Sequence, residues 1–118
     1  MIKIYGIKNC DTIHKAIKWL DTNKIEYAFH NYKESGIDIE TLKEWLKHFA
    51  IDKLINTKGT TFRALTDGEK SSITNSSKAI ALMVAKPSLI KRPVWDFGNG
   101  KFYLGWNESE ISKILLDK

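Results

Sequence analysis

The chain has 118 residues, a formal net charge of +5 and 42% hydrophobic residues. That length can form one core without disulfides or a metal. No apolar run approaches the roughly 18–20 residues of a membrane span, and a strand pattern at the start argues against a signal peptide. The single cysteine excludes an internal disulfide and a zinc site made of cysteines alone, and it is typical of a reducing cytoplasm. We expect one cytoplasmic domain over residues 1–118.

The positive charge is spread along the chain. Its 19 lysines and arginines form no block of five or six like charges, and aromatic residues do not interleave with them as in an RNA-recognition motif. We therefore expect neither a nucleic-acid nor a membrane partner. The charge suits small anionic substrates.

The first elements predict a β-α-β unit. Residues 1–5 and 25–32 alternate between polar and apolar positions, which is typical of strands, and residues 11–22 carry one apolar stripe at helical spacing. A crossover of this length is right-handed, so the two strands should be parallel.

The middle of the chain, residues 33–88, contains only helix and loop patterns and looks like an insertion. A helix should begin after Asp38, a short one should cover residues 59–65, and another should cover 76–86. The polar run 67–76 is predicted to be the least ordered part of the chain.

The last elements predict a β-hairpin and a helix. Residues 94–97 and 101–106 flank Gly98-Asn99-Gly100, a strong hairpin signal. Asn107 and Glu110 resemble a helix-capping pair. The order predicts an α/β fold in which helices cover a mixed sheet.

Cys10 lies on the turn between the first strand and the first helix. The free N–H groups and the dipole of a helix start favour an anion, so the thiol should ionise below its ordinary pKa of about 8.5. Lys8 should add to this effect and Asp11 should oppose it. The alternative is a buried, inert cysteine.

The chemistry open to a lone thiol is limited. An adduct formed when Cys10 attacks an electrophilic sulfur or an oxyanion must be released by a second thiol, and the chain has none. We therefore expect glutathione or a glutaredoxin-like protein as external reductant, with no bound cofactor. Cys10 of a second copy would instead give an oxidised dimer. With no Cys-His cluster we expect no metal. His14, four residues after Cys10, is either a solvated helix residue or a proton-transfer group.

Several stretches carry a family resemblance: residues 5–12, 54–61, 87–93 and 103–106. In this order, with a helical insertion between the halves, they are similar to the ArsC (arsenate reductase) family, which also includes the Spx regulators. The YffB branch is the nearest match. The resemblance implies a thioredoxin-like fold and a glutathione-dependent thiol reductase that acts on a small anionic or disulfide substrate.

The resemblance also implies roles for single residues. Cys10 falls on the nucleophilic cysteine, and Arg92 on an arginine that contacts the oxyanion and lowers the pKa of the cysteine. Pro93 falls on a cis proline beside the active-site turn, and Lys58 lies in a loop that often carries another basic residue. The predicted site thus has Cys10 and Arg92 as catalytic residues, with Lys8, Lys58, Arg92 and Pro93 binding the anion.

Two departures from the family bear on the substrate and keep rival functions open. No arginine follows Arg92, where arsenate reductases carry another anion-binding arginine. Ile13 stands where most Spx regulators have a second cysteine. The alternatives are a non-enzymatic, Spx-like regulator that binds a protein such as RNA polymerase, and a true arsenate reductase.

Overall fold

The computed structural model describes residues 2–116, which form two compact units. The first unit runs to His30 and resumes at Arg92, and the second is Asn31–Lys91. The second unit therefore covers the segment expected as an insertion at about 33–88.

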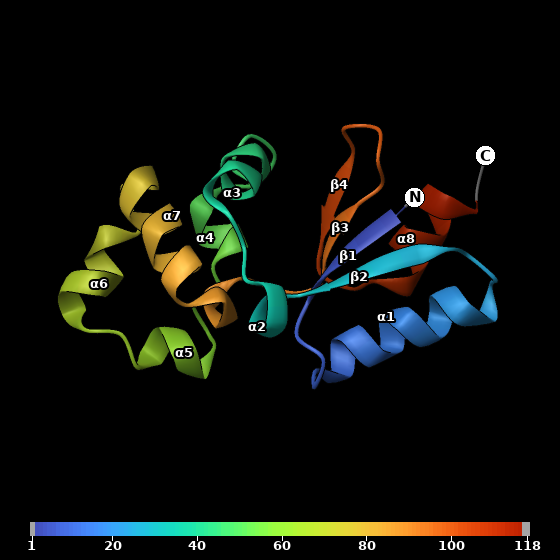
Figure 1. The fold of residues 1–118 in the computed structure, drawn as a ribbon, viewed down its shortest axis with the longest axis horizontal. Helices are drawn as coiled ribbons and strands as arrows, with labels where there is room; N and C mark the ends of the chain where they lie inside the picture. Colours follow the sequence, from blue (N-terminus) through green and yellow to red (C-terminus); the bar gives the residue numbers. More distant parts are fainter. Residues whose placement is uncertain (1, 117–118) are drawn as a thin grey trace. The chain divides into compact units, whose positions relative to one another are not determined.

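The first unit contains the sheet and two helices (Figure 1). Its elements are β1 (Ile2–Gly6), α1 (Asp11–Thr22), β2 (Tyr27–Asn31), β3 (Val94–Asp96), β4 (Phe102–Leu104) and α8 (Glu108–Leu115). The strand order is β2-β1-β3-β4, and β3 is antiparallel to both β1 and β4. β1 and β2 run in the same direction (Figure 1), so the sheet is mixed, as predicted.

One buried cluster holds this unit together. Ile4 of β1 and Trp95 of β3 are register partners, so their side chains share one face of the sheet. They pack against the buried stripe of α1 and against Ile111 of α8, which places both helices on that face. The stripe, Ile13, Ala16 and Leu20, has the helical spacing that predicted α1.

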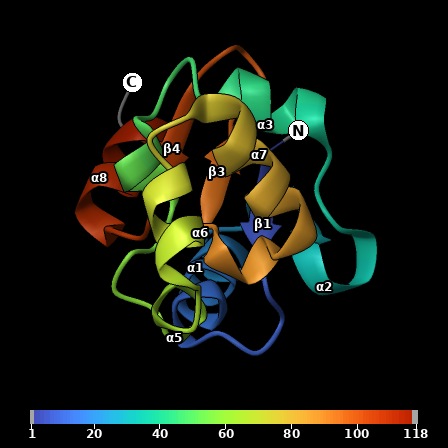
Figure 2. The same ribbon diagram turned by 90° about the vertical axis from the view of Figure 1, so that its left-hand side faces the viewer.

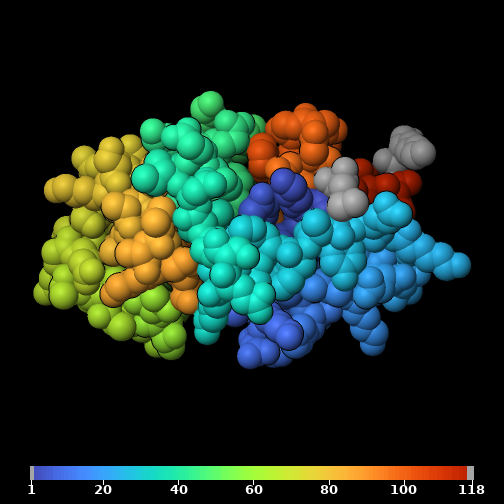
Figure 3. Space-filling view, in the orientation of Figure 1, coloured from blue at the N-terminus to red at the C-terminus, as the bar shows by residue number. Residues whose placement is uncertain are grey.

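The second unit consists of short helices (Figure 2). They are α2 (Tyr32–Ser35), α3 (Ile39–Trp45), α4 (Ile51–Leu54), α5 (Thr60–Arg63), α6 (Asp67–Ser72), α7 (Ser76–Ala85) and the 3-10 turn η1 (Pro87–Leu89). Their core includes Leu42, Trp45, Leu54 and Met83. In Figure 3, side chains of α6 and α7 form the yellow-green to orange part of this unit's surface.

One prediction for this region was wrong at the level of local structure. The polar run 67–76 was expected to be the least ordered, yet it begins with α6. Thr66 caps that helix by accepting from the N–H of Glu69, while the Glu69 side chain accepts from the N–H of Thr66, a complete capping box. The strand expected over 25–32 is confirmed as β2, which ends at Asn31; the Asn31 side chain accepts from the N–H of Lys33 and starts α2.

The described helices are all short. The longest, α1, has 12 residues, so none has the length and apolar character to cross a bilayer.

Candidate active site

Cys10 is placed by the start of α1, of which it is the N-cap residue, with extended backbone angles of φ −130° and ψ 125°. Serine, threonine, asparagine or aspartate usually accepts from the first helical N–H groups at such a position. The thiol makes no strict capping hydrogen bond, but the N–H groups of Thr12 and Ile13 lie close enough to favour its anionic form. The predicted position of Cys10 between strand and helix is confirmed.

Gly6, at the end of β1, lets the parts of the site come close together. A Cβ added there would lie 2.9 Å from Cγ1 of Ile13, closer still to its terminal methyl group, and 3.6 Å from Cβ of Arg92. Ile13 is fully buried and has no space into which to move. The absence of a side chain at Gly6 therefore allows Ile13, in the first turn of α1, to pack directly against the end of the strand.

Arg92 supplies the cation beside the thiol. It is half-buried just before β3, and its peptide bond to Pro93 is cis, as the family resemblance implies. The N–H of Gly105 donates to the Pro93 carbonyl over 2.8 Å, which ties this segment to the end of β4. The Arg92 guanidinium donates a hydrogen bond to the Cys10 sulfur.

Opposing effects act on the pKa of Cys10. Partial burial is the largest single effect and raises this pKa. The N–H of Ile13, the hydrogen bond from Arg92, the N–H of Thr12 and the Arg92 charge together outweigh burial, so the pKa lies below its ordinary value. Lys8 and Asp11 are not among the described groups that shift this pKa, and both are exposed, where water screens their charges. Because the thiolate is the nucleophile, the arrangement increases the reactive fraction at neutral pH.

His14 holds the cysteine turn. Its Nε2 lies 2.8 Å from the Lys8 carbonyl oxygen, and because a carbonyl only accepts, Nε2 must carry the proton. The backbone N–H of His14 donates to the Cys10 carbonyl over 3.0 Å. Nε2 is thus engaged with the backbone. A contact across six residues of an irregular turn leaves no periodic signal, so the sequence did not reveal it.

Lys58, the other predicted basic residue, belongs to the second unit. Its side chain is exposed, and it lies three residues after Ile55, which forms an isolated β-bridge. The Lys58 carbonyl accepts a hydrogen bond of 2.8 Å from Nη2 of Arg63. With Lys53 and Lys91 it lines a hollow of about 360 Å³. A role for Lys58 in binding an anion together with Cys10 stays a prediction.

The first unit therefore brings together two of the predicted residues, Cys10 and Arg92, and Pro93 follows Arg92 directly in the chain. The site offers a thiol of lowered pKa and a guanidinium that can also face an anionic substrate. Within residues 2–116 no group of three or more His, Cys, Asp or Glu side chains is placed to hold a metal ion.

Comparison with known proteins places this site in a family. The ArsC family profile matches residues 5–114. A solved structure titled YFFB (PA3664) protein is 42% identical, with a TM-score of 0.89 over 95% of this chain and 96% of that one. An arsenate reductase (ArsC) related protein from Brucella melitensis is 44% identical, with a TM-score of 0.74 over 94% and 91%. The global transcriptional regulator Spx of Lactiplantibacillus plantarum is 27% identical over 120 residues, 100% of this chain and 89% of the regulator.

These matches span nearly the whole chain, and the likeness to the YFFB structure confirms the predicted thioredoxin-like α/β fold. The match from residue 5 to residue 114 includes both the cysteine turn and Arg92. The chain belongs to the ArsC family.

Proposed function

We propose that this protein is a thiol-dependent reductase that uses Cys10 as its nucleophile and glutathione as its external reductant. One observation carries the proposal. The only cysteine of the chain lies at the start of α1, where helix N–H groups and Arg92 lower its pKa. Arg92 would stabilise the thiolate and orient an anionic substrate, with Lys8, Lys58 and Pro93 as further contacts. A cell compartment rich in reduced glutathione, the cytoplasm, suits this chemistry.

The proposed cycle has two thiol-disulfide exchanges. In the first, the Cys10 thiolate attacks the glutathione sulfur of a substrate mixed disulfide, forms a Cys10–glutathione disulfide and releases the substrate thiolate. In the second, a glutathione thiolate attacks that disulfide, frees the Cys10 thiolate and leaves as oxidised glutathione. Overall, one glutathione thiolate reacts with one mixed disulfide, and the products are the substrate thiolate and one molecule of oxidised glutathione. A lone cysteine suffices because the resolving thiol comes from glutathione.

Mass spectrometry after incubation with oxidised glutathione tests the proposal. We expect one glutathione adduct on Cys10, removed by fresh thiol and missing in Cys10→Ser. A parallel ultraviolet titration of the thiolate should have its midpoint below about 8.5. A protein that takes up no glutathione, or a thiol that titrates at or above that value, would overturn the assignment.

A second candidate function rests on the likeness to Spx along the whole chain. A non-enzymatic regulator would bind a protein such as RNA polymerase in fixed proportion and would keep that binding in Cys10→Ser, so co-purification with each form separates the two roles. Arsenate reduction is a third outcome. It would appear as arsenate-dependent NADPH consumption in an assay coupled to glutathione and glutaredoxin, and the lack of an arginine after Arg92 makes us expect none.

A further inference from the structure

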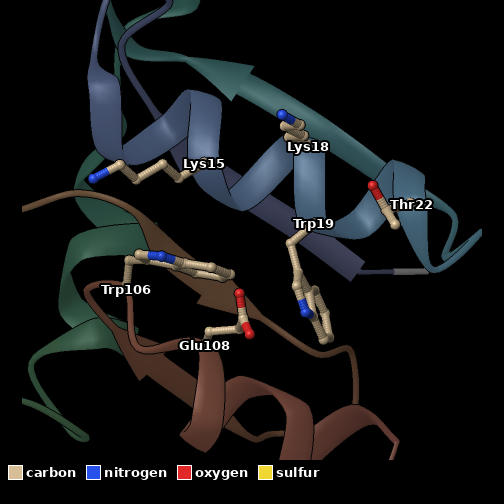
Figure 4. Close-up of a pocket in the computed structure, with 6 residues that line it drawn as sticks. All are labelled: Lys15, Lys18, Trp19, Thr22, Trp106 and Glu108. Carbon is tan, nitrogen blue, oxygen red and sulfur yellow. The ribbon is translucent and has the colours of Figure 1, made fainter.

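The first unit contains a hollow of about 340 Å³ between one face of α1 and the segment that leads into α8 (Figure 4). It is lined by Lys15, Lys18, Trp19, Thr22, Trp106 and Glu108. The four α1 residues stand at i, i+3, i+4 and i+7, so they form one strip along the helix. No role assigned above uses this strip.

Two indole rings form the apolar part of the hollow. Trp19 and Trp106 both point into the space between α1 and α8 (Figure 4), with ring centroids 6.1 Å apart and ring planes inclined by 64°. Trp106 also stacks on Trp95 at 6.0 Å, and Trp95 is fully buried with its indole N–H donating to the Gly105 carbonyl. Trp106 is thus a fixed, half-exposed aromatic surface of the kind that dominates binding sites.

The rim of the hollow carries uncompensated charge. Lys15 and Lys18 lie on the α1 side and Glu108 on the α8 side, and all three are exposed. No ion pair engages any of them within the part of the chain that the structure describes. A ligand carboxylate would be attracted to the two lysines and repelled by Glu108, which directs it to the α1 side.

The position of the hollow relates it to the thiol. Cys10 and Trp106 pack against the same buried cluster, and the strip begins five residues along the chain from Cys10. At 1.5 Å per residue, Lys15 lies about 7.5 Å and Thr22 about 18 Å beyond Cys10 along the helix axis. An extended chain covers those distances in about two to five residues.

We propose that this hollow binds an extended segment of a protein substrate whose cysteine, two to five residues away, forms the mixed disulfide attacked by Cys10. A large apolar or aromatic side chain contacts Trp19 and Trp106, and a neighbouring carboxylate lies against Lys15 and Lys18. Lining side chains that are exposed or half-exposed cover one side of a chain, whereas a small molecule is usually enclosed on most of its surface. This inference rests on the proposed function and names its substrate class.

The test uses three blocked peptides with one cysteine each, linked to glutathione by a disulfide. The peptides differ in the dipeptide that lies three residues before the cysteine, which is Glu-Phe in the first peptide, Lys-Phe in the second and Glu-Ala in the third. We expect the release rate (kcat/KM) to be about tenfold higher for Glu-Phe than for either other peptide, as about 1.4 kcal/mol of contact would give. The double variant Lys15→Ser, Lys18→Ser should remove the preference for Glu-Phe over Lys-Phe. The matched control Lys101→Ser, Lys113→Ser, which changes two exposed lysines of the same unit outside the hollow, should keep it.

A binding measurement separates this inference from the proposed function. In Cys10→Ser, the indole N–H resonances of Trp19 and Trp106 should shift with the Glu-Phe peptide without its glutathione and not with glutathione alone. Equal rates for all peptides, or loss of preference in the control variant, would overturn the inference while Cys10 chemistry stood. Shifts caused by glutathione alone would overturn it too. If the peptide shifts the indoles but Cys10 takes up no glutathione, the reductase assignment fails and the hollow remains a peptide-binding site.

Discussion

In both units a tight turn before a helix is closed by a hydrogen bond to a lysine carbonyl. In the first unit His14 of α1 bonds the carbonyl of Lys8, and in the second Arg63 of α5 bonds the carbonyl of Lys58, each over 2.8 Å. A glycine also lies beside each turn, Gly6 at the end of β1 and Gly59 at the start of α5, and an added Cβ at either would come within 3.0 Å of a neighbouring side chain. Their backbone construction is therefore alike.

The two turns differ at the residue that caps the helix and in what the arginine contacts. Cys10 caps α1, and Arg92 donates to its sulfur. Gly59 caps α5, and the Arg63 guanidinium donates to the backbone carbonyl of Lys58. The same kind of turn thus either activates a side chain or stabilises its own loop. What decides between them is whether a titratable group occupies the cap with a cation aimed at it.

The largest effect is expected from replacing the arginines. Arg92→Ala removes a hydrogen bond and a charge that both lower the pKa of Cys10, so the pKa should rise and alkylation by iodoacetamide at neutral pH should slow several-fold. Arg63→Ala, the matched change in the second turn, should leave the alkylation rate unchanged. The pH dependence of alkylation, followed by mass spectrometry, measures both. If the two variants react alike, Arg92 is not the group that activates the thiol.

An element can be predicted from sequence when its buried positions recur at a regular spacing along the chain. The stripe of α1 predicted that helix because one face of it is buried. The alternation of residue types predicted β1, although burial alternates only over Lys3 and Ile4, since Tyr5 and Gly6 are buried as well. The start of α6 could also have been predicted, since Thr66 and Glu69 stand at capping-box spacing. The polar composition of residues 67–76 instead led to the expectation of disorder. The position of Cys10 followed from the strand and helix that flank it.

Contacts between distant parts of the chain left no such signal. Arg92 stands 82 positions after Cys10, and only the family resemblance connected the two. Lys8 was expected to act on the thiol because it is near in sequence, but its side chain is exposed and its carbonyl makes the structural contact. The hollow beside α1 could not be predicted for the same reason, because two of its six lining residues, Trp106 and Glu108, come from the start of α8 and the segment before it.

The next largest effect is expected from the two glycines. Gly6→Ala forces a Cβ against the buried Ile13, and such overpacking typically costs about 1–3 kcal/mol of unfolding free energy. Gly59→Ala meets mainly the Asn56 side-chain amide, 2.8 Å away, which can turn aside, and its φ of −82° suits alanine. We expect a loss within about 1 kcal/mol there. Urea denaturation measures both, and a larger loss for Gly59→Ala would mean that the second turn is the more tightly packed.

A smaller effect is expected from His14. His14→Ala removes the bond to Lys8, and an exposed hydrogen bond of this kind contributes about 0.5–1.5 kcal/mol. Because the turn carries Cys10, the rate of thiol alkylation at fixed pH should change as well, whereas Arg63→Ala should reduce stability alone. His14→Gln, whose amide can donate to the same carbonyl, should recover part of both quantities. If His14→Ala loses stability without any change in alkylation, the bond supports the fold and does not position the thiol.

The smallest effect is expected in the pH dependence of stability, to which each unit should contribute over a different pH range. The N–H of Thr66 holds the pKa of Glu69 below its ordinary value, with burial opposing it. A carboxyl with a lowered folded pKa stabilises the fold above its unfolded pKa of about 4.3, and that contribution is lost as the pH falls through the folded value. The lowered pKa of Cys10 affects stability in the same direction at higher pH. Stability should therefore increase as the pH rises from the pKa of this thiol in the folded protein toward its unfolded value of about 8.5.

Thermal unfolding followed across pH separates the two contributions. Glu69→Gln should flatten the acid side of the stability curve and leave the neutral-to-alkaline side unchanged, while Cys10→Ser should do the reverse. Glu40→Gln, which removes an exposed carboxylate of the same unit outside the capping box, controls for the change in net charge. If Cys10→Ser leaves the upper side of the curve as steep as in the wild type, the groups around the sulfur do not favour the thiolate in the folded state. The contrast between an activating turn and a purely structural one would then disappear.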